Sequence, residues 1–396
     1  MNILFLFNRP ITAYSGGVER VTSILARHLA DKGHKAVYLC YSDEDFSEQK
    51  ADFEDVQLFI RPSDCEQLRQ EQLKGIIDGC KIDAVVDQVM MIDLSCTIKK
   101  MYSFIPVIGV YHNQPFAYYG KERKLMENYY PTSVKGKIFR WAGMLLPLTT
   151  RLYYNRFYRK LFEEMLACYD RVCLLTESFI PRVKAHMGDA VCGKLIAINN
   201  PNTFDSVADA NDTKKEKIIL MVGRVYNLSK NMLDFMRMWR ALAPKNPQWR
   251  AVIVGDGPDL ERLKRYSSKH RMERIEFAGM QKDVSKYYEK ASIFCLTSIY
   301  EGWGMVLVEA LGKGCVPVAY DSFEAVHDII TDGVNGCVVP RFDVDALTAK
   351  IQYLIDNPQV VKTMQLKGPH SIEQFGGDVI ADKWTETIKE IQEQCR

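Results

Sequence analysis

The repeating unit of this chain is seen around the stretch Glu301-Gly302-Trp303-Gly304-Met305-Val306-Leu307-Val308-Glu309. Short apolar runs at 293–296 and 316–319 flank it and predict buried strands. Residues 305–311 predict a helix between them, preceded by a Gly-rich turn. The order strand, turn, helix, strand is typical of a parallel sheet covered by helices on both faces.

The same stretch carries candidate chemistry, because two carboxylates eight residues apart frame the turn. Glycines let the backbone approach a ligand closely. The free N–H groups at the start of the predicted helix can bind an anion. Glu309 falls among apolar residues of that helix, where a carboxylate is costly without partners. The stretch therefore fits a phosphate at the helix start and sugar hydroxyls near the carboxylates.

The alternation of strands and helices runs through the whole chain. Further strands are predicted at 2–7, 35–41, 56–60, 84–87, 107–110, 172–175, 195–198, 218–222, 251–254, 275–277 and 337–339. A polar stretch up to Lys217, after Asn199-Asn200-Pro201-Asn202, predicts a linker. We therefore predict an α/β fold with two Rossmann-like domains, 1–200 and 201–375, facing across a cleft at the carboxyl ends of their sheets. The terminal helix, within 376–396, is expected to return to the first domain.

Composition limits the class of protein. At 396 residues with 47% hydrophobic and 26% charged residues, the chain is expected to be globular with two domains. A formal charge of +2 gives no general attraction to nucleic acid. The 11 cysteines show no framework, and no secretory signal or membrane-spanning run is present, so we expect reduced thiols and a cytoplasmic location.

Loops that follow predicted strands hold the candidate phosphate-binding residues. The first loop lacks G-x-G-x-x-G, which argues against a dinucleotide dehydrogenase, but Gly16 and Gly17 precede a helix and could bring backbone N–H groups to a phosphate. An ordinary flexible turn is the alternative. Arg224 and Lys230 follow the strand at 218–222 and could neutralise a diphosphate, unless they are a solvated basic pair.

Two further motifs allow a functional and a structural interpretation. His112 follows the strand at 107–110, a position that favours function, although a lone histidine is more often structural. Asp43-Glu44-Asp45 matches the D-x-D pattern of metal-dependent sugar transferases. Because it lies in a polar loop among other acidic residues, we interpret it as solvated surface and predict no metal.

Residues 115–160 differ from the rest of the chain. They hold ten Lys and Arg residues against two Glu residues, interleaved with aromatic side chains and with an apolar patch at 141–148. Such a segment suits the surface of an anionic membrane, which would make the protein peripheral on the inner face. The alternative is a basic helical insertion packed on the first domain. No recognisable RNA-binding module surrounds the segment, which disfavours nucleic acid as a partner.

Taken together, these motifs resemble the retaining glycosyltransferases of family 4, of the type that builds bacterial surface polysaccharides. The resemblance is carried by the order and spacing of Val222-Gly223-Arg224, Lys230-Asn231, Gly255-Asp256-Gly257-Pro258, the Glu301–Glu309 stretch, Gly314-Cys315-Val316-Pro317-Val318 and Asp332-Gly333-Val334-Asn335-Gly336. It implies the GT-B fold and a nucleotide sugar as co-substrate, with no cofactor and no metal. Asn200-Pro201, where many members have Asn-Gly, departs from the family pattern.

The resemblance also implies roles for individual residues. We expect the donor diphosphate to be bound by Gly16, Gly17, Arg224 and Lys230, and both the sugar and the phosphate to be bound by the amides of Gly304, Met305 and Val306. Glu309 is expected to bind the ribose and Glu301 the donor sugar. His112 is expected to lie beside the anomeric carbon, and the Met280 backbone to lie near the base. The expected reaction is hexosyl transfer from a nucleotide diphosphate sugar, UDP being favoured, to a polysaccharide, lipopolysaccharide or lipid-linked saccharide. The alternatives are a sugar-nucleotide epimerase or a phosphorylase of the same fold, or a non-catalytic membrane-associated binder.

Overall fold

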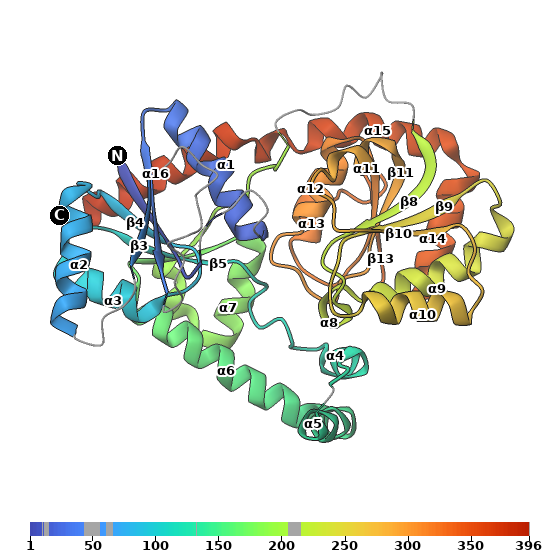
Figure 1. Cartoon of the computed structure of the whole chain (residues 1–396), viewed down its shortest axis with the longest axis horizontal. Coiled ribbons are helices and arrows are strands. Elements are labelled where there is room, and N and C mark those ends of the chain that lie inside the picture. Colours follow the sequence, from blue (N-terminus) through green and yellow to red (C-terminus); the bar gives the residue numbers. More distant parts are fainter. Residues whose placement is uncertain are drawn as a thin grey trace. The chain divides into compact units, whose positions relative to one another are not determined.

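The computed structural model describes residues 1–9, 11, 16–42, 56–60, 66–131, 133–204 and 215–395 (Figure 1). The chain divides into two compact units. Unit 1 comprises Met1–Pro115, Phe157–Thr203 and Phe375–Arg396, and unit 2 comprises Phe116–Arg156 and Phe204–Gln374. Both are α/β units with an entirely parallel sheet, as the apolar strand runs predicted.

Unit 1 holds a seven-stranded sheet in the order β3-β2-β1-β4-β5-β6-β7. Its strands are β1 (Asn2–Phe7), β2 (Lys35–Tyr41), β3 (Val56–Ile60), β4 (Ala84–Asp87), β5 (Val107–Tyr111), β6 (Arg171–Leu174) and β7 (Leu195–Ala197). The central strands β1, β4 and β5 are almost wholly buried, which explains why their sequences are nearly continuous apolar runs.

In unit 1, helices connect these strands, and a last helix follows the elements of unit 2 in the sequence. They are α1 (Gly17–Asp31), α2 (Glu66–Gly79), α3 (Ile92–Met101), α7 (Ile180–Met187) and α16 (Gly377–Cys395), with short 3₁₀ turns at Glu177–Phe179, Asp189–Lys194 and Glu373–Phe375. Helix α6 (Pro147–Cys168) begins in the residues of unit 2 and ends in those of unit 1.

The terminal helix returns to unit 1, as predicted from the sequence. Helix α16 lies against α1 in Figure 1, and His28 Nδ1 lies 2.8 Å from Asp378 Oδ1. Lys32 and Asp382 form a second ion pair one helical turn further on, at 2.7 Å. A Cβ atom at Gly377 would overlap the ring of His28, so glycine permits this close approach. The apolar face of α16, including Trp384 and Ile388, is buried.

Unit 2 holds a six-stranded sheet in the order β10-β9-β8-β11-β12-β13. Its strands are β8 (Glu216–Val222), β9 (Arg250–Val254), β10 (Ile275–Gly279), β11 (Ala291–Leu296), β12 (Val316–Tyr320) and β13 (Cys337–Val339). Counted from β8, this order is that of the Rossmann fold.

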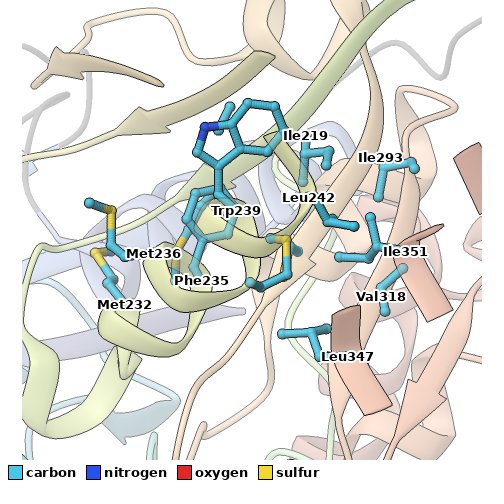
Figure 2. Close-up of a cluster of buried hydrophobic side chains, with 14 of the residues drawn as sticks. Ile219, Met232, Phe235, Met236, Trp239, Leu242, Ile293, Val318, Leu347 and Ile351 are labelled. Atoms are coloured by element: carbon cyan, nitrogen blue, oxygen red, sulfur yellow. The ribbon is translucent and has the colours of Figure 1, made fainter. Parts of the chain in front are cut away.

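Helices cover both faces of this second sheet. They are α8 (Asn227–Lys230), α9 (Met232–Leu242), α10 (Leu260–Lys269), α11 (Ser285–Lys290), α12 (Met305–Gly312), α13 (Val326–Ile329), α14 (Val344–Asp356) and α15 (Pro358–Ser371), with a 3₁₀ turn at Ala243–Lys245. Figure 2 shows one side of the core, where Phe235 and Trp239 of α9 lie among Ile219, Ile293 and Val318 of the sheet and residues of α14.

The basic and aromatic segment corrects one prediction from the sequence. It forms α4 (Glu122–Asn128), α5 (Val134–Leu145) and the start of α6. We expected residues 115–160 to belong to the first domain, but residues 116–156 belong to unit 2. The physical reason is that α4 binds polar and apolar side chains of the second half of the chain, among them Asp234 and Ile299.

The cysteines differ from expectation as well. Cys96 of α3 and Cys168 of α6 form a disulfide, with their Cα atoms 5.1 Å apart. Their separation of 72 residues gave no sign of this pairing, because the two helices come together only in the fold. Of the helices built from described residues, none is long and apolar enough to cross a membrane.

Candidate functional site

Both sheets have a point where the strand order reverses, and several of the candidate residues follow the strands that meet there. In unit 2 the reversal is between β8 and β11, and in unit 1 it is between β1 and β4. Open α/β sheets bind ligands beyond the carboxyl ends of the strands at such points. Gly223 and Arg224 follow β8, whereas Glu301 follows β11. The two neighbouring strands of unit 2 therefore deliver their loops to one edge of the sheet.

The turn after β8 is tight and built on glycines. Gly223 has φ +149°, and its N–H donates to the Val254 carbonyl at 3.0 Å. Arg224 is exposed, with its guanidinium carbon 5.8 Å from the centre of the Tyr226 ring. Gly255 has φ +136°, and a Cβ atom there would overlap the carbonyl oxygen of Gly223. Glycine at position 255 is therefore required for the turn that presents Arg224.

A compact polar cluster joins the loops after β8 and β11. Lys230 Nζ donates to Glu301 Oε1 at 2.6 Å, and Ser298 Oγ donates to the same oxygen at 2.6 Å. The lysine side chain is 21% exposed and the glutamate side chain 12% exposed, so water reaches the pair only in part. Thr297, which is fully buried, donates to the Lys230 carbonyl at 3.0 Å. The structure thus brings together two residues that the sequence separates by 71 positions.

The Gly-rich turn leads into α12 as predicted. Gly304 is the N-cap of that helix and has φ +91° and ψ 45°, a left-handed conformation that suits glycine. Met305 and Val306 begin the helix. Glu309 lies on the inner side of α12, is 4% exposed, and accepts a hydrogen bond from the Tyr288 hydroxyl at 2.9 Å. The prediction that a buried carboxylate at this position needs a partner is confirmed.

Helix α4 supports the end of α8, where Lys230 lies. The amide of Asn128 donates to Asn231 Oδ1 at 2.9 Å, and Asn231 adopts the left-handed conformation with φ 47°. Lys124 Nζ forms an ion pair of 3.0 Å with Asp234, whose side chain is fully buried. Asn231 Nδ2 also donates to Asp234 at 2.6 Å. These bonds fix the backbone directly after Lys230.

An apolar contact supports the loop before Glu301 in the same way. Leu125 and Met126 of α4 form a small buried cluster with Ile299. The Tyr118 ring lies 5.8 Å from the Tyr300 ring, centre to centre. Residues 116–130 therefore contact both loops that meet at the Lys230–Glu301 pair.

Met280 lies apart from this cluster. It follows β10 directly, and its side chain is 78% exposed. It borders a hollow of about 590 Å³ over the sheet, with Leu220, Val252 and Tyr287 in its wall. Among the described residues that line this hollow, no other predicted site residue occurs. The contact of the Met280 backbone with a base stays a prediction.

In unit 1, Gly16 and Gly17 lie at the start of α1. Gly16 is the N-cap, in an extended conformation, and Gly17 is the first helical residue. A Cβ atom at Gly16 would come within 3.0 Å of Glu19 Oε2. Glu19 is 2% exposed and accepts a hydrogen bond from Arg9 Nε at 2.6 Å. This buried, paired carboxylate at the helix start was not singled out in the sequence.

His112 follows β5 as predicted, and its environment is specific. Its Nε2 lies 2.6 Å from Oε1 of the buried Gln88, which follows β4. Since the amide oxygen accepts, Nε2 carries the proton in this arrangement. Desolvation by burial lowers the pKa of His112 to about 4. The ring is therefore a neutral hydrogen-bonding group at neutral pH.

The acidic motif Asp43-Glu44-Asp45, interpreted as solvated surface, lies outside the described residues. Within the described ranges, no group of three or more His, Cys, Asp or Glu side chains is arranged to hold a metal ion.

The structure also shows site residues that sequence reasoning missed. Ser298 and Thr297 hold Glu301 and Lys230, and Asn128 and Lys124 reach the same region from a distant segment. The two hydroxyl residues could have been noticed, because they directly follow a predicted strand. Nothing in the sequence indicated the partners of Asn128 and Lys124.

Comparisons with known proteins agree with this architecture. Residues 15–190 match the family model "Glycosyltransferase Family 4", and residues 204–370 match "Glycosyl transferases group 1". The chain is 30% identical over 194 residues to the amylovoran biosynthesis glycosyltransferase AmsD of Erwinia amylovora, covering 48% of this chain and 52% of that protein. It is 27% identical over 218 residues to an N-acetylgalactosaminyltransferase of Campylobacter jejuni whose name includes a PP-undecaprenol-linked saccharide, covering 54% of this chain and 57% of that protein.

The chain thus spans little more than half the length of these curated relatives. Among solved structures, Anabaena HepE in complex with UDP and glucose superposes with a TM-score of 0.71 at 17% identity, covering 98% of this chain and 99% of that one. This likeness extends over both units and supports the two-unit fold.

Proposed function

Since the chain belongs to the group 1 and family 4 glycosyltransferases with the GT-B fold, we propose that it transfers a hexosyl unit from a nucleoside diphosphate sugar to a saccharide acceptor, with retention of anomeric configuration. The observation that carries the proposal is the Lys230–Glu301 pair at the strand-order reversal of unit 2, together with the exposed Arg224 that directly follows Gly223 after β8. A partly buried cation at this place suits a diphosphate, and a neighbouring carboxylate suits sugar hydroxyls.

The donor would be held by groups of different chemistry. Arg224 and Lys230 provide positive charge for the diphosphate, and the amides of Gly304, Met305 and Val306 add hydrogen-bond donors at the start of α12. Glu309 would accept hydrogen bonds from the ribose hydroxyls. One of its carboxylate oxygens already accepts a hydrogen bond from the Tyr288 hydroxyl, which orients the side chain. The backbone after β10, at Met280, would meet the base.

Glu301 is assigned to the donor sugar and not to nucleophilic attack. Its Oε1 accepts hydrogen bonds from both Lys230 and Ser298, so the lone pairs of this oxygen are engaged and less available for attack. We therefore propose attack on the same face of the sugar. The acceptor oxygen bonds to the anomeric carbon as the bond from that carbon to the diphosphate oxygen breaks. The acceptor proton passes to the departing phosphate, and Arg224 and Lys230 stabilise its negative charge.

Residues of unit 1 complete the assignment. Gly16 and Gly17 would offer backbone N–H groups at the start of α1 to the donor diphosphate. His112 would act as a neutral hydrogen-bonding group beside the anomeric carbon, in keeping with its low pKa of about 4. The site would need no metal and no cofactor, because charge on the diphosphate is met by side chains and helix amides.

The substrates are proposed from the chemistry of the site and from the similarity of the chain to known proteins. UDP is the favoured nucleotide, supported by the fold likeness to the HepE complex with UDP and glucose. A polysaccharide, lipopolysaccharide or lipid-linked saccharide is the favoured acceptor, supported by the names of the Erwinia and Campylobacter relatives. Action at the cytoplasmic side of the envelope would follow from such an acceptor.

The decisive experiment offers the protein UDP- and GDP-sugars with and without saccharide acceptors, in the presence of a chelator. We expect turnover of one donor class, with product of unchanged anomeric configuration by NMR. An inverted product would refute same-face attack, and loss of activity with the chelator would refute metal independence. Conversion of the donor sugar without an acceptor would favour an epimerase, and binding without any turnover would favour a non-catalytic binder.

A further inference from the structure

Helix α5 exposes a continuous apolar face. Val134, Ile138, Trp141 and Leu145 are 71%, 64%, 64% and 74% exposed. Their spacing of four, three and four residues places all of them on one side of the helix. Large apolar side chains this exposed usually occur singly on a soluble protein, so four in one row mark a contact surface.

The exposed apolar character continues into the next helix. Leu146, Leu148 and Leu152, at the α5–α6 junction and in the first turns of α6, are 59%, 66% and 68% exposed. Phe139 of α5 lies edge-on to Tyr153 of α6, with ring centres 6.5 Å apart, so the two helices are held together. We call the seven residues Val134, Ile138, Trp141, Leu145, Leu146, Leu148 and Leu152 the apolar ridge.

The opposite side of α5 shows that this exposure is built into the sequence. Gly143 is buried, and a Cβ atom there would come within 2.8 Å of Met126 Cγ in α4. At Gly136 a Cβ atom would overlap Pro131. The helix therefore packs on the protein through glycines and directs its large apolar side chains outward. A helix of a soluble protein normally has the reverse arrangement.

The charge around the ridge is positive. Residues 133–160 contain seven Lys and Arg residues and no Asp or Glu. Arg140 donates to the Met126 carbonyl at 2.9 Å, and Arg151 pairs with Glu122 at 2.7 Å, so these two cations serve the fold. Lys135 and Lys137 of α5 and Arg156 of α6 are exposed. An apolar face with exposed cations beside it suits an interface with anionic lipid headgroups.

We propose that the apolar ridge docks on the surface of an anionic bilayer, with α5 lying in the plane of the headgroups and its apolar side chains inserted. A second copy of the chain would bring the same positive surface against itself, and like charges would oppose that contact. The bilayer supplies the negative charge that the ridge needs. The inference goes beyond the proposed function, since it concerns where the protein binds and not which bond it forms.

The test is flotation of the full chain with vesicles of phosphatidylcholine alone or mixed with phosphatidylglycerol. We expect the protein to float with the mixed vesicles, to bind weakly to the neutral ones, and to be released by salt. Trp141 emission should shift to shorter wavelength on binding, and W141F should lose that shift while still floating. Failure of the wild-type chain to float with anionic vesicles would overturn the proposal.

Variants distinguish binding through the apolar ridge from non-specific binding of the protein to vesicles. The double variant Ile138→Ser and Leu145→Ser should reduce vesicle partitioning at least tenfold. The matched control, Tyr353→Ser with Leu366→Ser, alters side chains that are 49% and 37% exposed in the same unit and should partition like the wild type. Unchanged partitioning of the ridge variant would contradict the proposal. The proposal would also be contradicted if the wild type did not bind vesicles but self-associated in sedimentation experiments, and the ridge variant abolished this self-association.

Activity on water-soluble substrates keeps this test separate from the proposed function. The ridge lies outside the residues assigned to the donor, so the ridge variant should turn over a soluble donor and acceptor like the wild type. An unchanged thermal midpoint would verify that it folds, as expected for changes at exposed positions. A ridge variant that floats poorly yet turns over normally would support docking. A chain that floats but shows no turnover would count against the proposed function alone.

Discussion

At the residue scale, the proposal depends most on the Lys230 ammonium. Lys230→Ala removes a point charge from a site where water is partly excluded, and it takes away one of the two donors to Glu301 Oε1 while the Ser298 hydroxyl stays. Loss of such electrostatic stabilisation should lower kcat by on the order of 10²–10³. The measurement is steady-state turnover of the donor, with the thermal midpoint as the check on folding.

A matched control for this variant is Lys264→Ala. Lys264 lies in the same unit and forms an ion pair with Glu261, but its side chain is 45% exposed and far along the sequence from the site. Surface ion pairs contribute about 0–1 kcal/mol, so this variant should keep wild-type turnover. Near-normal turnover by Lys230→Ala would contradict the proposed mechanism.

His112 gives a residue-scale prediction for pH. Its pKa is lowered from 6.5 to about 4 in the folded chain because the charged ring would be desolvated. The unfolded chain therefore binds more protons than the folded one between these values, and stability falls as pH falls through this window. His112→Gln removes this contribution, so its free energy of unfolding should decline less between pH 6.5 and 4 than that of the wild type.

Urea unfolding at a series of pH values measures this difference. His370→Gln serves as the control, because His370 is 81% exposed and lies on the surface beside Glu373. The control should follow the wild-type pH profile. If His112→Gln also followed it, the half-buried neutral ring would not be the cause of the acid sensitivity.

Sequence reasoning made its most specific predictions about single residues, and their roles stay predictions. Glu301, Glu309, Arg224 and Lys230 were identified because each belongs to a motif whose spacing along the chain is fixed by a strand and the helix after it. The pairing of Lys230 with Glu301 follows from the adjacency of β8 and β11, which a parallel-sheet topology makes natural. The partners Asn128 and Lys124 could not be predicted, because they come from a segment whose packing depends on tertiary contacts.

At the element scale, the glycine turns between strands determine how the cations are presented. Gly255→Ala should distort the turn after β9, since the new Cβ would overlap the Gly223 carbonyl oxygen and φ is +136°. Gly279→Ala is the control that separates backbone strain from steric overlap. Gly279 also has a positive φ, of +68°, but a Cβ atom there would meet no other described atom within 4 Å. Gly279→Ala should cost about 1–2 kcal/mol from its left-handed backbone alone, and Gly255→Ala should cost more. Denaturant unfolding of the two variants checks this order.

The functional part of this prediction concerns Arg224. Because the Gly255 turn contacts the Gly223 carbonyl, its distortion should displace Arg224 and lower donor affinity, whereas Gly279→Ala should leave the turn after β8 unchanged. Equal losses of stability in the two variants would show that the overlap with Gly223 has no particular effect.

The insertion is the element whose place in the fold was predicted wrongly. Its composition identified residues 115–160 as unusual, but its position between strands of the first sheet suggested that it packs there. Asn128 and Lys124 instead bind Asn231 and Asp234 of unit 2. Short side chains such as Asn128 reach only nearby groups, so their partners depend on the path of the backbone, which hydrophobic periodicity does not describe.

At the scale of the whole molecule, the parallel α/β character of both units was the most predictable property. Continuous apolar strands separated by helices allow few arrangements other than parallel sheets with right-handed crossovers. The two units and the return of α16 to α1 follow from that pattern and from the family resemblance. The disulfide between Cys96 and Cys168 was not predictable, since two cysteines 72 residues apart meet only after α3 and α6 have packed.

Each unit has its own core, which leads to a prediction about cooperativity. Trp384 of α16 is 5% exposed in unit 1, and Trp239 of α9 is fully buried in unit 2. Replacing either by Ala should cost about 3–5 kcal/mol through lost burial and the cavity left behind. Hydrogen exchange should then increase in α1 and β1 for Trp384→Ala, and in β8 and β11 for Trp239→Ala. Val379→Ala, at a position of α16 that is 40% exposed, should change neither.

The pattern of exchange distinguishes two ways in which the chain could unfold. Contacts within each unit hold α16 to α1 and α9 to the second sheet, so a cavity in one core should lower protection mainly in that unit. If both variants raised exchange equally throughout the chain, the two units would unfold as a single cooperative body. The segment 116–156 provides the sharpest readout, because its contacts predict that it loses protection with Trp239→Ala and not with Trp384→Ala.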